Sequence, residues 1–85
     1  MYELDIDIDC KKKFLKLAKK NPKQLEIIDK KILEIRSNPF HFKSLRGNMK
    51  GSYRVHIDSH FVLTYEIDDD IVRVLDFAHH NYIYK

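Results

Sequence analysis

Apolar and acidic residues alternate strictly over residues 2–8 of the chain. A period of two is typical of a β-strand that buries one face, so the pattern predicts a strand at the N-terminus. Asp9 follows at a position where its carboxylate can cap a helix. The apolar residues of that helix recur at helical spacing, and they are Cys10, Phe14, Leu17 and Ala18.

A second helix is predicted to begin at Asn21-Pro22. Asn is a preferred N-cap, Pro is favoured at the first helical position, and Gln24 can close a capping box with Asn21. Apolar residues then recur at helical spacing until Ser37-Asn38-Pro39 ends the pattern; they are Leu25, Ile28, Ile32 and Ile35. The link between the two helices is so short that they are expected to form an αα-hairpin.

The second half of the chain has the pattern of a β-meander. Residues 39–51 contain both glycines of the sequence among basic residues, which indicates a loop. Three predicted strands follow, over residues 52–57, 61–67 and 71–77, with polar turns at 58–59 and 68–70. The middle strand is almost continuously apolar or β-branched, as is typical of a central strand.

This order of elements predicts an α+β fold. The N-terminal strand and the helical hairpin are expected to pack against an antiparallel sheet of about four strands. A length of 85 residues corresponds to a single domain over residues 1–85.

Charge is distributed unevenly along the chain. The net charge is +3, yet residues 10–54 contain 14 Lys and Arg against three acids, and residues 56–85 contain two against six. A basic half in a small protein favours a polyanionic partner such as nucleic acid. The alternative is that lysine-rich helices are simply well solvated.

Several classes of protein are excluded by composition. The single cysteine, Cys10, allows neither an internal disulfide nor a cysteine-rich zinc site, and its place in an apolar stripe indicates a core residue. No apolar run is long enough to span a bilayer, and the acidic first residues do not resemble a signal peptide. We therefore expect a cytoplasmic protein without a membrane partner.

Candidate chemistry gathers on the predicted sheet and at the end of the chain. Arg54 and His56 are two residues apart on one strand and so share a face, and His60 lies across a tight turn. The adjacent His79 and His80 would point to opposite faces of a strand, which disfavours a metal site. Histidines beside a cation suit metal-independent RNA cleavage by acid–base catalysis. The alternative is that these histidines are ordinary solvated residues.

The whole-chain pattern resembles the RelE/ParE superfamily of toxins. The resemblance is carried by the segments KSLRGNMKG, YRVHI, FVLTYEI and VLDFAHH, in that order and spacing, along essentially all of the chain. It is most similar to the YafQ branch of RelE-type messenger-RNA endonucleases. It implies cleavage of messenger RNA in the ribosomal A site, no metal or other cofactor, and inhibition by a co-encoded antitoxin.

The resemblance also implies site residues. Catalytic positions of the YafQ branch fall on His56, His60, His80 and Tyr84, although the branch has an acidic residue where this chain has His60. Arg54 matches a lysine of RelE itself and takes a charge-stabilising role. Apart from the resemblance, Lys43, Arg46 and Lys50 are spaced to reach successive phosphates, and with Arg54 and His79 they are the predicted RNA-binding residues.

Two departures keep alternatives open. Lys43 stands where the YafQ branch has a histidine, and Val62 stands where many RelE relatives have an arginine. ParE members of the superfamily share the fold and inhibit DNA gyrase, which requires no acid–base groups. The alternatives to a ribonuclease are therefore a gyrase inhibitor and an inactive relative that only binds its antitoxin.

Overall fold

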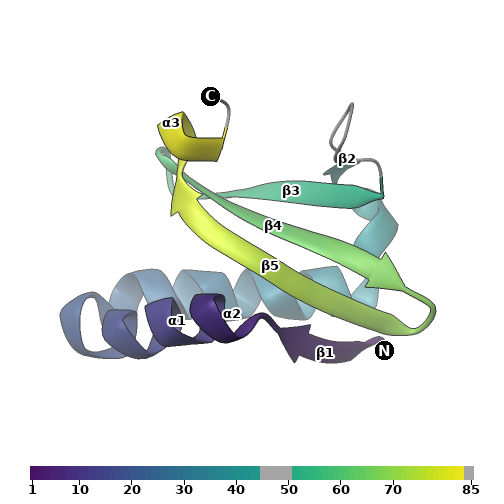
Figure 1. The fold of residues 1–85 in the computed structure, drawn as a ribbon, viewed down its shortest axis with the longest axis horizontal. Coiled ribbons are helices and arrows are strands. Elements are labelled where there is room, and N and C mark those ends of the chain that lie inside the picture. The colour runs from purple at the N-terminus through teal and green to yellow at the C-terminus, as the bar shows by residue number, and fades with distance from the viewer. Residues whose placement is uncertain (45–50, 84–85) are drawn as a thin grey trace.

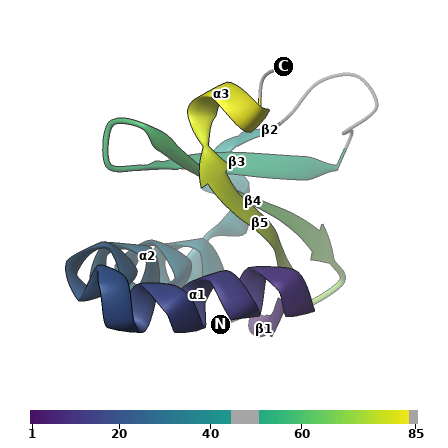
Figure 2. The same ribbon diagram turned by 60° about the vertical axis from the view of Figure 1, so that its left-hand side comes forward.

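Two helices and a β-sheet form the two main layers of the protein (Figures 1 and 2). The coordinates are a computed structural model, and the structure describes residues 1–44 and 51–83. The elements are β1 (Glu3–Ile6), α1 (Ile8–Lys20), α2 (Pro22–Ser37), a 3-10 turn η1 (Pro39–His41), β2 (Lys43–Ser44), β3 (Ser52–Ile57), β4 (Phe61–Asp68), β5 (Ile71–His79) and α3 (His80–Ile83). The α+β architecture predicted from the sequence is confirmed.

The N-terminal strand is shorter than the alternation predicted. Asp7, and not Asp9, caps α1: its carboxylate accepts hydrogen bonds from the backbone N–H groups of Asp9 and Cys10, at 3.0 and 3.4 Å. The helix therefore begins at Ile8, whose side chain is exposed. Ala18, assigned to the apolar stripe from its spacing, is also exposed.

The start of α2 follows the prediction in part. The Asn21 side chain accepts a hydrogen bond from the Gln24 backbone N–H, at 3.2 Å. The reciprocal half of the capping box is absent, because the Gln24 amide instead donates to the Asp58 carboxylate, at 3.3 Å. This contact joins the start of α2 to the turn between β3 and β4.

The sheet has the order β1-β5-β4-β3-β2 in the described part of the chain. The pairs β3–β4 and β4–β5 are antiparallel, as predicted. β2 also pairs antiparallel with β3, although its residues belong to the segment that was predicted to be a loop. The expectation of a wholly antiparallel sheet is wrong, because β1 adds to the edge of β5 in parallel, with Glu3 opposite Ile71. A parallel pair needs a long connection between its strands, and here the rest of the fold supplies it.

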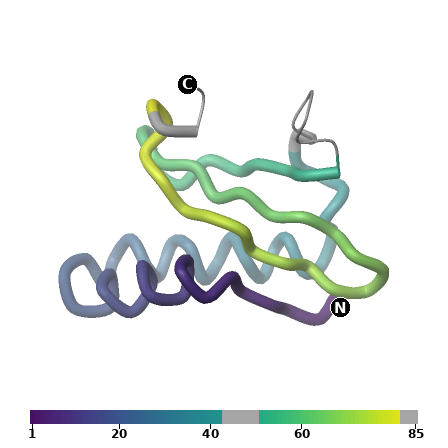
Figure 3. The backbone as a smooth tube through the Cα atoms, viewed as in Figure 1, coloured from purple at the N-terminus to yellow at the C-terminus, as the bar shows by residue number. Residues whose placement is uncertain are grey.

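A β-bulge interrupts the pairing of β5 with the central strand β4. Thr64 lies opposite Asp76 and Tyr65 lies opposite Val74, so Leu75 has no opposite residue. Val74 before the bulge and Phe77 after it are both buried in the core, although they are three residues apart. The bulge therefore shifts the alternation of the strand by one residue, and β5 bends as it crosses the helices (Figure 3).

The core lies between the helical hairpin and one face of the sheet. Its helical members were all predicted from spacing, namely Cys10, Phe14, Ile28, Ile32 and Ile35, and its sheet members are Val55, Ile57, Leu63, Tyr65, Val72, Val74 and Phe77. Val62 and Thr64 point to the opposite face of β4 and are buried as well. The central strand is thus covered on both faces, as its apolar composition indicated.

Removing the Tyr65 hydroxyl should destabilise the fold. The hydroxyl of this fully buried residue donates a hydrogen bond to the Pro39 carbonyl, at 2.5 Å. Tyr65→Phe leaves that carbonyl without its partner, so we expect the free energy of unfolding to fall by about 1–3 kcal/mol in urea denaturation. The control is Tyr53→Phe, because the Tyr53 ring stacks on Tyr65 but its hydroxyl has no hydrogen bond within the described residues. Equal losses in the two variants would contradict this account.

The Cys10 thiol should be unreactive in the native protein. Burial, with a smaller contribution from the nearby Asp76 carboxylate, raises the pKa of Cys10 from 9.0 to about 12. Because the thiolate is the nucleophile, we expect alkylation at pH 8 to be slower than in the denatured chain by roughly two orders of magnitude or more. Similar rates in the two states would show that the thiol is accessible.

The same shift sets the direction of the pH dependence. The unfolded chain loses its thiol proton first, so the contribution of Cys10 to the free energy of unfolding should be constant below about pH 8 and fall as the pH rises toward the folded pKa. Burial also raises the pKa of Tyr65, which acts in the same direction at higher pH. Urea denaturation at a series of pH values between roughly 7 and 11 measures the fall, and a rise over this range would contradict it.

Candidate functional site

Four of the five histidines of the chain lie at one end of the sheet, in two stacked pairs. The rings of His56 and His80 have their centroids 5.9 Å apart and an interplanar angle of 23°. The rings of His60 and His79 are also 5.9 Å apart and are nearly parallel, at 7°. The fifth histidine, His41, lies in η1, away from this group. We call the four residues the histidine cluster.

The register of the sheet explains the first pair. His56 lies opposite Val62 of the central strand, and Val62 in turn lies opposite Ala78 of β5. His80 follows Ala78 by two residues, at the start of α3, so its ring reaches back over the row that contains His56. Both side chains are exposed to solvent. His56 alternates with the core residues Val55 and Ile57, so this pair lies on the face of the sheet away from the helical hairpin.

The second pair is formed at the turn between β3 and β4. His60 is the last residue of this turn, directly before β4. His79 ends β5 opposite Phe61, and the two rings are in a T-shaped arrangement with their centroids 5.4 Å apart. The backbone N–H of His80 donates to the carbonyl of His60, at 2.7 Å. Both pairs thus meet at one backbone contact.

The structure separates the two adjacent histidines in a way that the sequence did not predict. His79 and His80 were expected to continue a strand, whereas β5 ends at His79 and a helical turn begins at His80. His79 lies on the same side of β5 as the core residue Phe77, and His80 contacts His56 on the other side of the sheet. His80, and not His79, therefore lies on the face of the sheet that carries Arg54 and His56.

Basic residues border the histidine cluster along the sheet. Arg54 lies two residues before His56 on β3 and is half-buried; its strand neighbours are Lys43 on β2 and Thr64 on β4. Val62, where related toxins carry an arginine, is fully buried in the row of His56. Arg46, Lys50 and Tyr84, which the sequence assigned to the site, lie outside the described residues, as does the side chain of Lys43.

A lysine-rich surface adjoins the same end of the molecule. Residues 11–23 contain seven lysines and no acidic residue. Lys13 pairs with Asp76 at 2.7 Å, and the other six form no ion pair with the residues that the structure describes. The contact between Gln24 and Asp58 places the end of this lysine run next to the turn that carries His60. Sequence spacing gave no signal for this proximity or for the pairing of His60 with His79.

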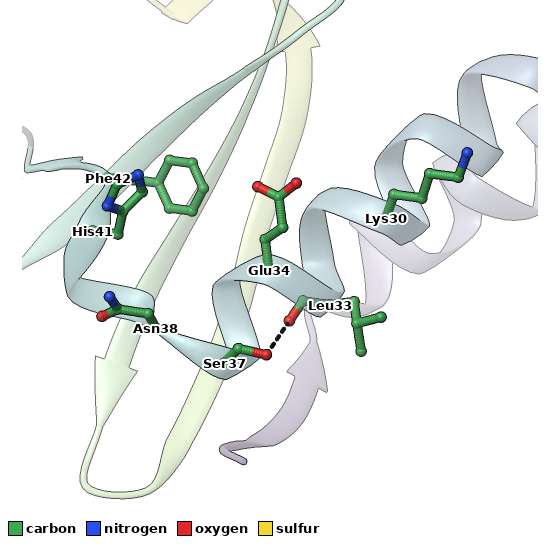
Figure 4. A pocket seen from close by; sticks show the side chains of 7 residues that line it. All are labelled: Lys30, Leu33, Glu34, Ser37, Asn38, His41 and Phe42. Carbon is green, nitrogen blue, oxygen red and sulfur yellow. Dashed lines mark hydrogen bonds between the residues drawn. The ribbon is translucent and has the colours of Figure 1, made fainter.

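A separate hollow lies at the other end of α2 (Figure 4). Its volume is about 400 Å³, and it is lined by Lys30, Leu33, Glu34, Ser37, Asn38, His41 and Phe42. His41 is the one histidine here, and the pair of facing imidazoles seen in the histidine cluster is not repeated. The hollow is therefore not the candidate catalytic site.

Two further observations concern metals and membranes. Among residues 1–44 and 51–83, no three His, Cys, Asp or Glu side chains are grouped so that they could hold a metal ion. None of the helices in those ranges has the length and apolar character that crossing a bilayer requires.

The chain is similar in sequence to toxins of toxin–antitoxin systems. Residues 9–84 match the family profile described as the ParE toxin of the type II toxin–antitoxin system parDE. A protein of Methanocaldococcus jannaschii assigned as toxin RelE4 is 44% identical over 100% of this chain and 93% of its own length. An uncharacterized protein of Methanosarcina mazei is 50% identical over 99% of this chain and 100% of its own length.

Solved structures share the fold at lower identity. The YoeB/ParE toxin from Agrobacterium tumefaciens has a TM-score of 0.85 at 16% identity, covering 92% of this chain and 98% of that chain. YafQ from Escherichia coli has a TM-score of 0.77 at 16% identity over 100% of both chains. A chain of the intact Escherichia coli RelBE toxin–antitoxin complex has a TM-score of 0.76 at 24% identity, covering 93% of this chain and 96% of that chain. With the family profile and the two archaeal relatives, this fold shows that the chain belongs to the RelE/ParE superfamily of type II toxin–antitoxin toxins.

Proposed function

We propose that the protein is an endoribonuclease that cleaves messenger RNA on the ribosome, in the cytoplasm, without a metal ion or other cofactor. The observation that carries the proposal is the pair of exposed, facing imidazoles of His56 and His80, on the same face as the Arg54 guanidinium. A toxin that acts only by binding has no need of two facing titratable groups.

The chemistry requires two proton transfers at one phosphodiester. A base removes the proton of the 2′-hydroxyl, which attacks the adjacent phosphorus, and an acid protonates the 5′-oxygen as it leaves. The products are a 2′,3′-cyclic phosphate and a free 5′-hydroxyl. Two imidazoles with centroids 5.9 Å apart can both address one phosphodiester group, one as the base and the other as the acid.

Arg54 supplies positive charge to the same face. Its guanidinium is always protonated and offers several N–H donors, which suits the negative charge that develops on the phosphorane. In this proposal Arg54 takes the place of the cation that related toxins carry at the position of Val62. Tyr84, also assigned from the resemblance, is proposed as a further group that acts on the reacting atoms.

The basic loop and the lysine run are proposed to hold the RNA backbone. Lys43, Arg46 and Lys50 flank the glycines of the loop, and Lys43 opposes Arg54 on the neighbouring strand. His79 was also predicted to bind RNA. Lysine contacts to phosphates bind without regard to sequence, as expected for an enzyme that acts on many messages.

The partner is proposed to be a co-encoded antitoxin. Solved complexes of this fold include RelBE from Escherichia coli and YoeB-YefM from Staphylococcus aureus. An inhibitor that binds the basic half of this chain would compete with RNA for the same charges.

The family profile itself favours a second candidate, because its description is that of ParE. ParE toxins inhibit DNA gyrase, and an inactive antitoxin-binding relative is the third possibility. The histidine cluster distinguishes them: gyrase inhibition should survive its removal, whereas RNA cleavage should not.

Replacing either histidine of the first pair should abolish cleavage without unfolding the protein. We expect His56→Ala and His80→Ala each to lower the cleavage rate by about 100- to 10,000-fold, since each removes one proton-transfer group. Both side chains are exposed, so the melting temperature and antitoxin binding should change little. Primer extension on messages in a translation reaction measures the cuts.

His41→Ala is the matched control, because His41 lies in η1 and outside the histidine cluster. It should cleave at the wild-type rate. A double variant of His56 and His80 that still cuts messages normally would overturn the proposal. A double variant that still arrests growth, and that causes DNA breaks while messages stay intact, would favour the gyrase inhibitor.

Removing charge from the basic loop should weaken RNA binding and its dependence on salt. For Arg46→Ala with Lys50→Ala we expect the slope of log Kd against log salt to fall by about 1.4, since each phosphate contact to a single strand contributes about 0.7. A message mimic with a 2′-deoxy group at the cut site allows binding to be measured without cleavage. The charge-matched control is Lys30→Ala with Lys31→Ala, two residues that pair with Glu26 and Glu34 on α2. Equal slopes for the two variants would refute the role of the loop.

A further inference from the structure

The position of His80 depends on contacts outside its own helix. α3 contains four residues, and a helix of one turn has no stability of its own in water. Its first residue, His80, must therefore be held by the elements against which α3 packs. Three contacts at the start of α3 involve His60 and His79.

The first contact is the backbone hydrogen bond from the His80 N–H to the His60 carbonyl, at 2.7 Å. The second is the stacking of the His60 ring on the His79 ring, with centroids 5.9 Å apart at 7°. The third is a hydrogen bond from the Asn81 N–H to Nδ1 of His79, at 3.2 Å. An N-cap residue accepts in this way from the second residue of a helix, so His79 caps α3.

Both members of the second pair are themselves anchored to the core. The His79 ring packs against the Phe61 ring in a T-shaped arrangement, and the Phe61 ring stacks on the buried Phe77, with centroids 5.2 Å apart. His60 belongs to the turn that Gln24 holds from α2 through Asp58. Asp58 occupies the left-handed backbone region, with φ of 57°, as the tight turn requires. The core therefore fixes the positions of His60 and His79, and these two residues in turn hold the start of α3.

We propose that His60 and His79 are positioning residues, which hold α3 so that His80 lies over His56, and that neither transfers a proton in the reaction. This inference rests on the proposed function and divides the four histidines into two roles. It also explains how this chain accommodates a histidine at position 60, where the YafQ branch has an acidic group: stacking requires a flat ring and not a charge.

The distinguishing substitution keeps the ring and removes the proton chemistry. His60→Phe can stack on His79 but cannot donate or accept a proton, so cleavage should stay within about threefold of wild type with both limbs of its pH–rate profile intact. His60→Ala removes the stack, and kcat should fall by about 10- to 100-fold with KM nearly unchanged, as expected when a reacting group is displaced by about an ångström. Ser59→Ala, in the same exposed turn, is the control and should match wild type.

His79→Phe separates the two contacts of that residue. It keeps the stack and loses the acceptor for the Asn81 N–H, so its kcat should lie between those of wild type and His79→Ala. Rescue by Phe at both positions is a result that a proton-transferring histidine would not give.

A readout independent of activity completes the test. Amide hydrogen exchange of His80 and Asn81 should be faster in His60→Ala and His79→Ala and unchanged in His60→Phe. If His60→Phe is as inactive as His60→Ala while exchange is unchanged in both, His60 reacts directly and the positioning role is overturned. If the wild-type protein does not cleave RNA, the proposed function fails, and the exchange measurement alone decides whether the second pair holds α3.

Discussion

The bulge in β5 is the constraint on which the rest of the sheet depends. It leaves Leu75 without a partner opposite the Thr64–Tyr65 step, so that Val74 and Phe77 both reach the core. Unbroken alternation from Val74 would bury the charged Asp76 and leave Phe77 in solvent, an arrangement that carries a large penalty. With the bulge, Asp76 is free to pair with Lys13 of α1. The one extra residue, Leu75, therefore lets Val74 and Phe77 both pack in the core, and it determines on which face of the sheet the histidines at the end of β5 lie.

The histidine cluster lies where three strands of this bulged sheet start or end. β3, β4 and β5 all start or finish there, so residues from turns and strand ends meet over a short distance while the strands themselves stay packed. The covered central strand gives the cluster a rigid base, because Val62, which lies opposite His56, is fully buried. Such a site joins exposed, titratable groups to a scaffold that does not need them for its stability.

Sequence patterns predicted the elements well and the contacts between them less well. Periodicity located both helices and the meander because burial of one face imposes it, and Asn21 marked the start of α2 correctly. The parallel addition of β1 has no local signature, since it joins residues far apart in the chain. The family resemblance assigned His56 and His80 to one site. The strand pattern alone could not decide whether His79 or His80 lies on the face of His56, because a single bulged residue reverses the answer. The pairing of His60 with His79 arises only from the turn and the end of β5 together.

The parallel pairing of β1 with β5 has a consequence for the order of events during synthesis. Glu3 is made early, yet its partner Ile71 follows it by most of the chain, and contacts of such long range slow folding. Until β5 has left the ribosome, β1 has no partner and α1 covers an incomplete sheet. His79 and His80 emerge later still. Every nascent chain that stops short of these residues therefore lacks the histidine cluster, even when both helices have already formed.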